Sequence, residues 1–206
     1  MQRALLTTAV AVIMTVLALS SAGCGGSPKT SALPTVHAPA SDKPAAVTRA
    51  AANEAGAKEA EVYEQVLRRY LSSPAENSFP GRAFKVVYVL DQAYPDAADP
   101  NGTHERGEPI APQAQRQVTA ELAGMARVIF VADRGSVMEA RDGCAQVRNG
   151  GILITLGAPV THGHEMRVGV NGFVACTGAT WLTYVLQDQP GVGWRVTGTT
   201  GSMAIS

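Results

Sequence analysis

Short segments that alternate apolar and polar residues fill the C-terminal half of the chain, and they limit its fold more than any other feature. They are RVIFVA at 127–132, GILITL at 151–156, MRVGV at 166–170, GATWLTYVLQ at 178–187 and WRVTGT at 194–199. A period of two places alternate side chains on opposite faces of a strand. In the fourth segment, Leu182, Tyr184 and Leu186 therefore share one face. FKVVYVL at 84–90 is rich in β-branched and aromatic residues and predicts a further strand.

A turn that contains Asp188, Pro190 and Gly191 joins the last two of these segments, as expected for antiparallel neighbours. Asn171-Gly172 also has the sequence of a tight hairpin turn, which would end the third segment there. The sequence alone leaves that boundary open. We expect a curved, mostly antiparallel sheet of about five to six strands, whose apolar face packs against another layer.

The covering layer is predicted from residues 47–71, where apolar residues recur at steps of three and four. They are Val62, Tyr63, Val66, Leu67, Tyr70 and Leu71. Pro74 prevents the helix from continuing. A shorter helix is predicted at 112–123. The fold class is therefore α+β, with a long N-terminal amphipathic helix packed on the sheet in a single domain of residues 47–206.

Residues 91–112 show no periodic pattern. An irregular stretch of about 20 residues is unusual in a compact domain, and is either functional or ordered by packing. Asp99, Asn101, Gly102 and Glu108 match a calcium-loop template, but Ala97 stands at its first position, where a carboxylate ligand is required. We therefore predict a structural turn in this stretch.

The first 23 residues have the build of a signal peptide. Arg3 precedes an uncharged, mainly apolar run at 4–19, which is shorter than the roughly 20 residues of a spanning helix. The small residues before Cys24 resemble the bacterial lipobox, with Ser21 where leucine is usual. We expect cleavage before Cys24 and a lipid on its thiol, which anchors the chain to the extracytoplasmic face of the cell membrane. An ordinary secretory cleavage nearby and an uncleaved anchor are the alternatives.

Residues 24–46 comprise the lipidated cysteine and a segment rich in proline and alanine, which predicts an extended tether between membrane and domain. The domain then has two cysteines, Cys144 and Cys176. Disulfides persist outside the cytoplasm, so we predict a bridge between them. Two buried free thiols and a reactive thiol are the alternatives.

Few residues indicate chemistry. His162 and His164, at i and i+2 of a strand, would project to one side and share a metal ion; the alternative is a hairpin tip with solvated histidines.

Four aromatic residues on the strands form either the core or a ligand pocket, namely Tyr88, Trp181, Tyr184 and Trp194. The sequence contains no phosphate loop, dinucleotide-binding glycine pattern or nucleophile motif, so we assign no catalytic residue and no cofactor. With 17 basic and 17 acidic residues, the chain has no electrostatic basis for binding nucleic acid.

The ending WLTYVLQDQPGVGWRVTGTTGSMAIS at 181–206 resembles that of a family of uncharacterised secreted lipoproteins from actinobacteria. The resemblance covers residues 60–206, and its most specific part is WLTY at 181–184 with WRVTG at 194–198. The same pair of strands is similar to the last hairpin of NTF2-like and cystatin-like domains. The family has no assigned activity, so the resemblance carries over no functional residue.

These features favour a membrane-anchored, non-enzymatic module that binds an envelope protein or a small ligand. One alternative is a metal-binding protein or metal-dependent enzyme that uses His162 and His164. Another is small-ligand binding in an NTF2-like cavity.

Overall fold

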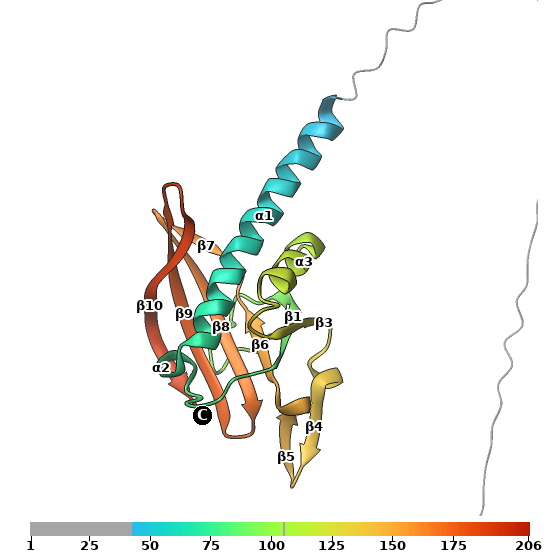
Figure 1. The fold of residues 1–206 in the computed structure, drawn as a ribbon, viewed down its shortest axis with the longest axis vertical. Coiled ribbons are helices and arrows are strands. Elements are labelled where there is room, and N and C mark those ends of the chain that lie inside the picture. The colour runs from blue at the N-terminus through green and yellow to red at the C-terminus, as the bar shows by residue number, and fades with distance from the viewer. Residues whose placement is uncertain (1–42, 105) are drawn as a thin grey trace, which may run out of the picture. The chain divides into compact units, whose positions relative to one another are not determined.

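A mixed β-sheet forms the centre of the protein, and α1 and α3 lie on one of its faces (Figure 1). The computed structural model describes residues 43–104 and 106–206. The helices are α1 (Lys43–Ser72), α2 (Pro74–Asn77) and α3 (Pro112–Glu121). The strands are β1 (Val86–Ala93), β2 (Glu108–Pro109), β3 (Arg127–Val131), β4 (Met138–Arg141), β5 (Cys144–Val147), β6 (Ile152–Leu156), β7 (Val160–His162), β8 (Glu165–Ala175), β9 (Gly178–Gln189) and β10 (Gly193–Ile205). Within this part of the chain, no helix has the length and apolarity to cross a membrane.

The α+β class is confirmed, and the sheet is curled and rich in antiparallel pairs. Antiparallel pairing runs from β6 through β8 and β9 to β10. The other half differs from the expectation, because β1 pairs in parallel with β3, where Val87 faces Val128, and with β6, where Val87 faces Ile152. The helix α3 returns the chain from the end of β1 to the start of β3, which makes those strands parallel. Alternation in a sequence does not encode strand direction.

The boundary left open at Asn171-Gly172 is settled by the pairing of β8. Asn171 pairs with Trp181 and Gly172 with Thr180 of β9, so the dipeptide lies inside β8 and is not a turn. The third strand therefore extends to Ala175.

The hairpin of β4 and β5 was not predicted. Its turn is Asp142-Gly143, with φ of 52° and 77°, and such a dipeptide is a strong hairpin signal. Its strands are four residues each and largely exposed, so they lack the apolar alternation on which the strand prediction relied. The dipeptide Gly150-Gly151, which also has the sequence of a hairpin turn, connects β5 to β6, and these two strands do not pair with each other.

Figure 1 shows α1 laid across β8, β9 and β10, as the apolar stripe predicted. All but one of its stripe residues are fully buried, namely Val62, Tyr63, Val66, Leu67 and Tyr70. Leu71 is half-buried at the edge of the same core. The Tyr63 hydroxyl also donates to the carbonyl of Gly157, 3.2 Å away, so the helix is fixed to the sheet by a polar contact as well as by packing.

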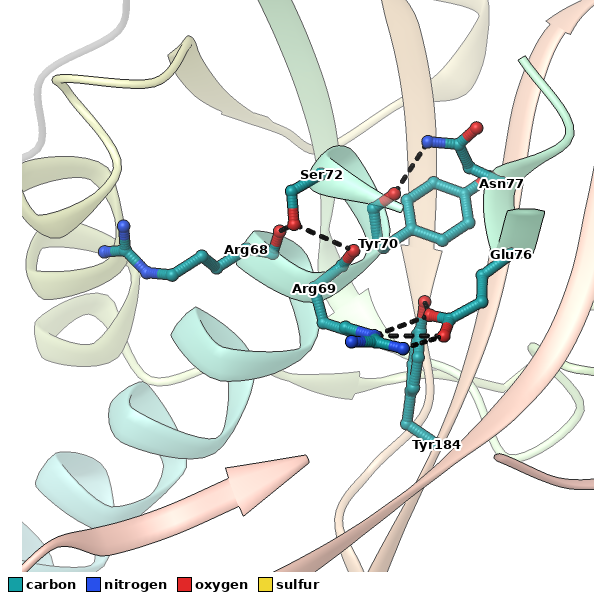
Figure 2. Close-up of polar contacts among 7 residues, drawn as sticks. All are labelled: Arg68, Arg69, Tyr70, Ser72, Glu76, Asn77 and Tyr184. Carbon is teal, nitrogen blue, oxygen red and sulfur yellow. Dashed lines mark hydrogen bonds and ion pairs between the residues drawn. The ribbon is translucent and has the colours of Figure 1, made fainter. Parts of the chain in front are cut away.

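The last turn of α1 is held by buried polar contacts (Figure 2). The Asn77 amide donates to the carbonyl of Tyr70 at 2.7 Å, which satisfies an acceptor that the end of a helix leaves free. The Tyr70 hydroxyl in turn bonds the hydroxyl of Thr180 on β9. Gly172 makes room for this, because a Cβ there would overlap the Tyr70 hydroxyl.

Glu76 of α2 joins α1 to the sheet. Its carboxylate accepts from the guanidinium of Arg69 and, at 2.8 Å, from the hydroxyl of Tyr184 on β9 (Figure 2). Burial raises the pKa of Glu76, but the hydrogen bonds from Arg69 and Tyr184 outweigh it and hold the pKa below its usual value. The Glu76 carboxylate is already paired with Arg69 and Tyr184, so we interpret the cluster as structural.

The face of the sheet opposite α1 carries a second, smaller core. It consists of Tyr88, Leu90, Val137, Val147 and Leu153. A disulfide between Cys144 and Cys176 joins the β4–β5 hairpin to the turn between β8 and β9, with 5.6 Å between the Cα atoms. The predicted bridge is thus confirmed.

Candidate functional site

The irregular stretch after β1 packs on the face of the sheet opposite α1. It is shorter than predicted, because β1 continues to Ala93 and pairs there with β2. Ala97 is fully buried. Gly169 of β8 permits this close approach, since a Cβ there would lie 3.1 Å from the Cβ of Ala98. The stretch is therefore ordered by packing, which was one of the two expectations.

Between this stretch and the sheet lies a cavity of about 380 Å³, here called the loop cleft. We define it by Thr103, His104, Arg134, Asn171, Phe173 and Trp181. A volume of this size suits a small molecule. Its walls come from four separate parts of the chain, which only the folded sheet brings together.

The outer wall of the loop cleft is fixed by Asp96 and His104. His104 has a φ of 54°, which residues other than glycine rarely adopt. The Asp96 carboxylate accepts from the backbone N–H of His104 and bonds its Nδ1, each at 2.9 Å. Burial raises the pKa of Asp96, but these hydrogen bonds outweigh it and lower the pKa below its usual value. Glycine at position 102 lets the Asp96 carboxylate lie close to the backbone there, because a Cβ on Gly102 would be 2.6 Å from that carboxylate.

The cation of the loop cleft is Arg134, the first residue of a 3-10 turn, Arg134–Val137. Its guanidinium carbon lies over the Phe173 ring, 4.5 Å from the centroid. Burial lowers the pKa of the guanidinium. Asp133 holds the turn, since its carboxylate accepts from the backbone N–H of Ser136 at 3.0 Å. Ser136 is therefore a turn residue, and Arg134 is the group that faces the cleft.

The sheet side of the loop cleft presents Asn171 and Trp181, a directly facing pair on β8 and β9. Asn171 is buried, and its amide donates to the carbonyl of Thr180 at 3.0 Å. Trp181 is half-buried and exposes part of its ring to the cavity. The cleft thus combines two aromatic rings, an amide and a cation.

A larger groove of about 560 Å³ runs beside α1, next to β7 and β8. Its charged groups are already engaged. The Glu59 carboxylate accepts from the backbone N–H of Ala111, 3.2 Å away, and the Lys58 ammonium lies 5.0 Å from the centre of the Trp194 ring. The loop cleft is the better candidate, because it places an amide and two aromatic side chains beside its cation, whereas the lining of the groove is mainly apolar.

The two histidines of the metal hypothesis lie at the tip of the β7–β8 hairpin. His162 is the last residue of β7 and pairs with Glu165, while Gly163 and His164 form the turn. Both side chains are exposed, and they do not occupy alternate positions of one strand. Among the described residues, no three His, Cys, Asp or Glu side chains gather in a way that would hold a metal ion. Metal binding by this pair stays a prediction.

The other predicted positions divide clearly. Tyr88, Tyr184 and Trp194 are core residues, whereas Trp181 lines the loop cleft. Cys24 lies outside the described residues. Arg134 and His104 were not singled out from the sequence, because neither belongs to a local motif. Only the folded sheet places them near residues of β8 and β9.

Comparisons with protein-family models, with curated proteins and with solved structures found no match.

Proposed function

We propose that this chain is an extracytoplasmic, lipid-anchored module that binds a small ligand in the loop cleft. The observation that carries the proposal is the Arg134 guanidinium, which lies over the Phe173 ring and lines a cavity of about 380 Å³. In the α1 groove, in contrast, the Glu59 carboxylate already accepts from the backbone N–H of Ala111.

Packing determines on which face of the sheet a ligand can bind. The helix side of the sheet is filled by Tyr63, Tyr70 and Tyr184, all fully buried. An NTF2-like cavity on that face would have to displace them. The opposite face holds the loop cleft, whose rim is an ordered loop rather than a core helix. We therefore place small-ligand binding in the loop cleft, and not in an NTF2-like cavity on the helix side of the sheet.

Blocking the loop cleft tests the proposal. Thr103 is exposed and lines the cavity, so Thr103→Trp adds bulk without disturbing the core. Thr199→Trp, at an exposed position of β10, is the matched control. Mixtures of small aromatic acids, amines, sugars and nucleosides are screened by saturation-transfer NMR. We expect compounds that bind the wild type and Thr199→Trp but lose binding to Thr103→Trp. The proposal fails if no compound binds, or if all that bind do so equally to Thr103→Trp.

The anchor is tested separately. We expect the full chain, expressed in a bacterium with lipoprotein processing, to incorporate a radiolabelled fatty-acid precursor. Cys24→Ser should abolish that label, because no acyl acceptor remains. Ser21→Ala, which keeps the acceptor, is the control and should stay labelled. Equal labelling of Cys24→Ser and wild type would contradict lipidation at Cys24.

A further inference from the structure

The geometry points to a ligand class for the loop cleft: we infer that it takes a small monocarboxylate with a planar, apolar body, whose carboxylate pairs with Arg134. This inference rests on the proposed function, because it names the ligand of the same site.

The contact with Phe173 determines how Arg134 presents its hydrogen-bond donors to a ligand. Its guanidinium carbon lies over the Phe173 ring, 4.5 Å from the ring centroid. A guanidinium has five N–H donors, and Arg134 forms none of the ion pairs among the described residues, so these donors are available to a ligand. The planar fork of these donors matches a carboxylate, which it binds with two parallel hydrogen bonds. Phe173 thereby holds the side chain in place before a ligand arrives.

The charges of the loop cleft favour a monoanion over a dianion. Arg134 supplies one permanent cation, while Asp99 lies at the rim and is exposed. The Asp99 carboxylate accepts from the backbone N–H of Asn101 at 2.8 Å and stays near the opening. A dianion such as a phosphate monoester would be repelled more strongly by Asp99 than a carboxylate would. The Nδ1 of His104 is already engaged by the Asp96 carboxylate, 2.9 Å away.

The remaining walls select the body of the ligand. Trp181 presents a half-buried ring, and Pro100 adds an apolar surface on the loop side. Flat rings pack well against such surfaces. The volume of about 380 Å³ is at the small end for ligand sites. A one-ring or two-ring acid therefore fits the cleft better than an extended chain.

Benzoate and benzamide provide the test, because they share a shape and differ in charge. In calorimetric titrations of the full chain, we expect benzoate to bind at least about tenfold more tightly than benzamide, and more tightly than phenyl phosphate. Arg134→Gln should weaken benzoate binding by roughly 10- to 100-fold, since hydrogen bonds between charged groups are the strong ones. Arg134→Lys, which keeps the charge but loses the fork, should weaken it less.

Arg127→Gln is the matched control, because Arg127 is an exposed arginine of β3 outside the loop cleft. It should bind benzoate like the wild type, and thermal melts of all variants confirm folding. If benzamide binds as tightly as benzoate and Thr103→Trp blocks both, the ligand class is wrong and the proposed function stands. If phenyl phosphate binds more tightly than benzoate, the class is likewise wrong. If neither these probes nor any screened compound binds the wild type, the proposed function fails as well.

Discussion

Replacing both cysteines of the disulfide, Cys144→Ala with Cys176→Ala, is expected to lower the free energy of unfolding by roughly 4 kcal/mol. The bridge closes a loop with a sequence separation of 32 residues, and it restricts the unfolded chain more than the folded one. The packing loss is small, because Cys176 is exposed and Cys144 only half-buried. Most of the effect therefore comes from the unfolded state.

Urea denaturation of the full chain measures this effect, with Cys24→Ser in every sample so that no other thiol is present. The double variant should unfold at a lower urea concentration than its parent. The parent under reducing conditions should match the variant, which serves as the internal control. Equal midpoints for the oxidised and reduced parent would show that the bridge contributes nothing to stability.

Gly172→Ala is expected to lower the free energy of unfolding by about 2 to 4 kcal/mol. The new methyl group would occupy the space of the Tyr70 hydroxyl, in a region where Thr180 and Asn77 are buried as well. Overpacking of this kind costs about 1 to 3 kcal/mol, and displacement of Tyr70 also breaks its hydrogen bond to Thr180, worth about 1 kcal/mol.

A double-mutant cycle isolates that contact. In a Tyr70→Leu background the ring and its hydroxyl are gone, so Gly172→Ala should then cost less than about 1 kcal/mol. Gly198→Ala on β10 is the control, since no atom lies within 4 Å of a Cβ built there. If Gly172→Ala costs the same in both backgrounds, the close approach of Tyr70 is not the reason for glycine at this position.

The sequence predicts those features of the fold that depend on a local pattern of residues. The stripe on α1 was predicted from spacing alone, and its residues Tyr63, Leu67 and Tyr70 are fully buried. The faces of β9 were predicted as well, because Leu182 and Tyr184 are buried in the same core. In both cases one period along the chain decides which side chains turn inward.

What depends on distant partners was not predicted. The parallel pairing of β1 with β6 joins Val87 to Ile152, and nothing near either residue indicates the other. Arg134 and Phe173 form the base of the loop cleft, but in the sequence they are an ordinary arginine and a strand phenylalanine. A site assembled from the meeting of distant segments leaves no local motif, which is why the histidine pair seemed the sharper candidate.

The order of the elements has a consequence for export. In a chain that crosses a membrane with its N-terminus leading, α1 emerges first, whereas Tyr184 and Trp194, which complete the core against it, come at the end. The central strand β1 also cannot complete its pairing until β6, which comes later in the chain, has emerged. If the chain is exported, as we propose, the part of the α1 stripe that packs on β9 and β10 would stay uncovered until translocation is nearly complete.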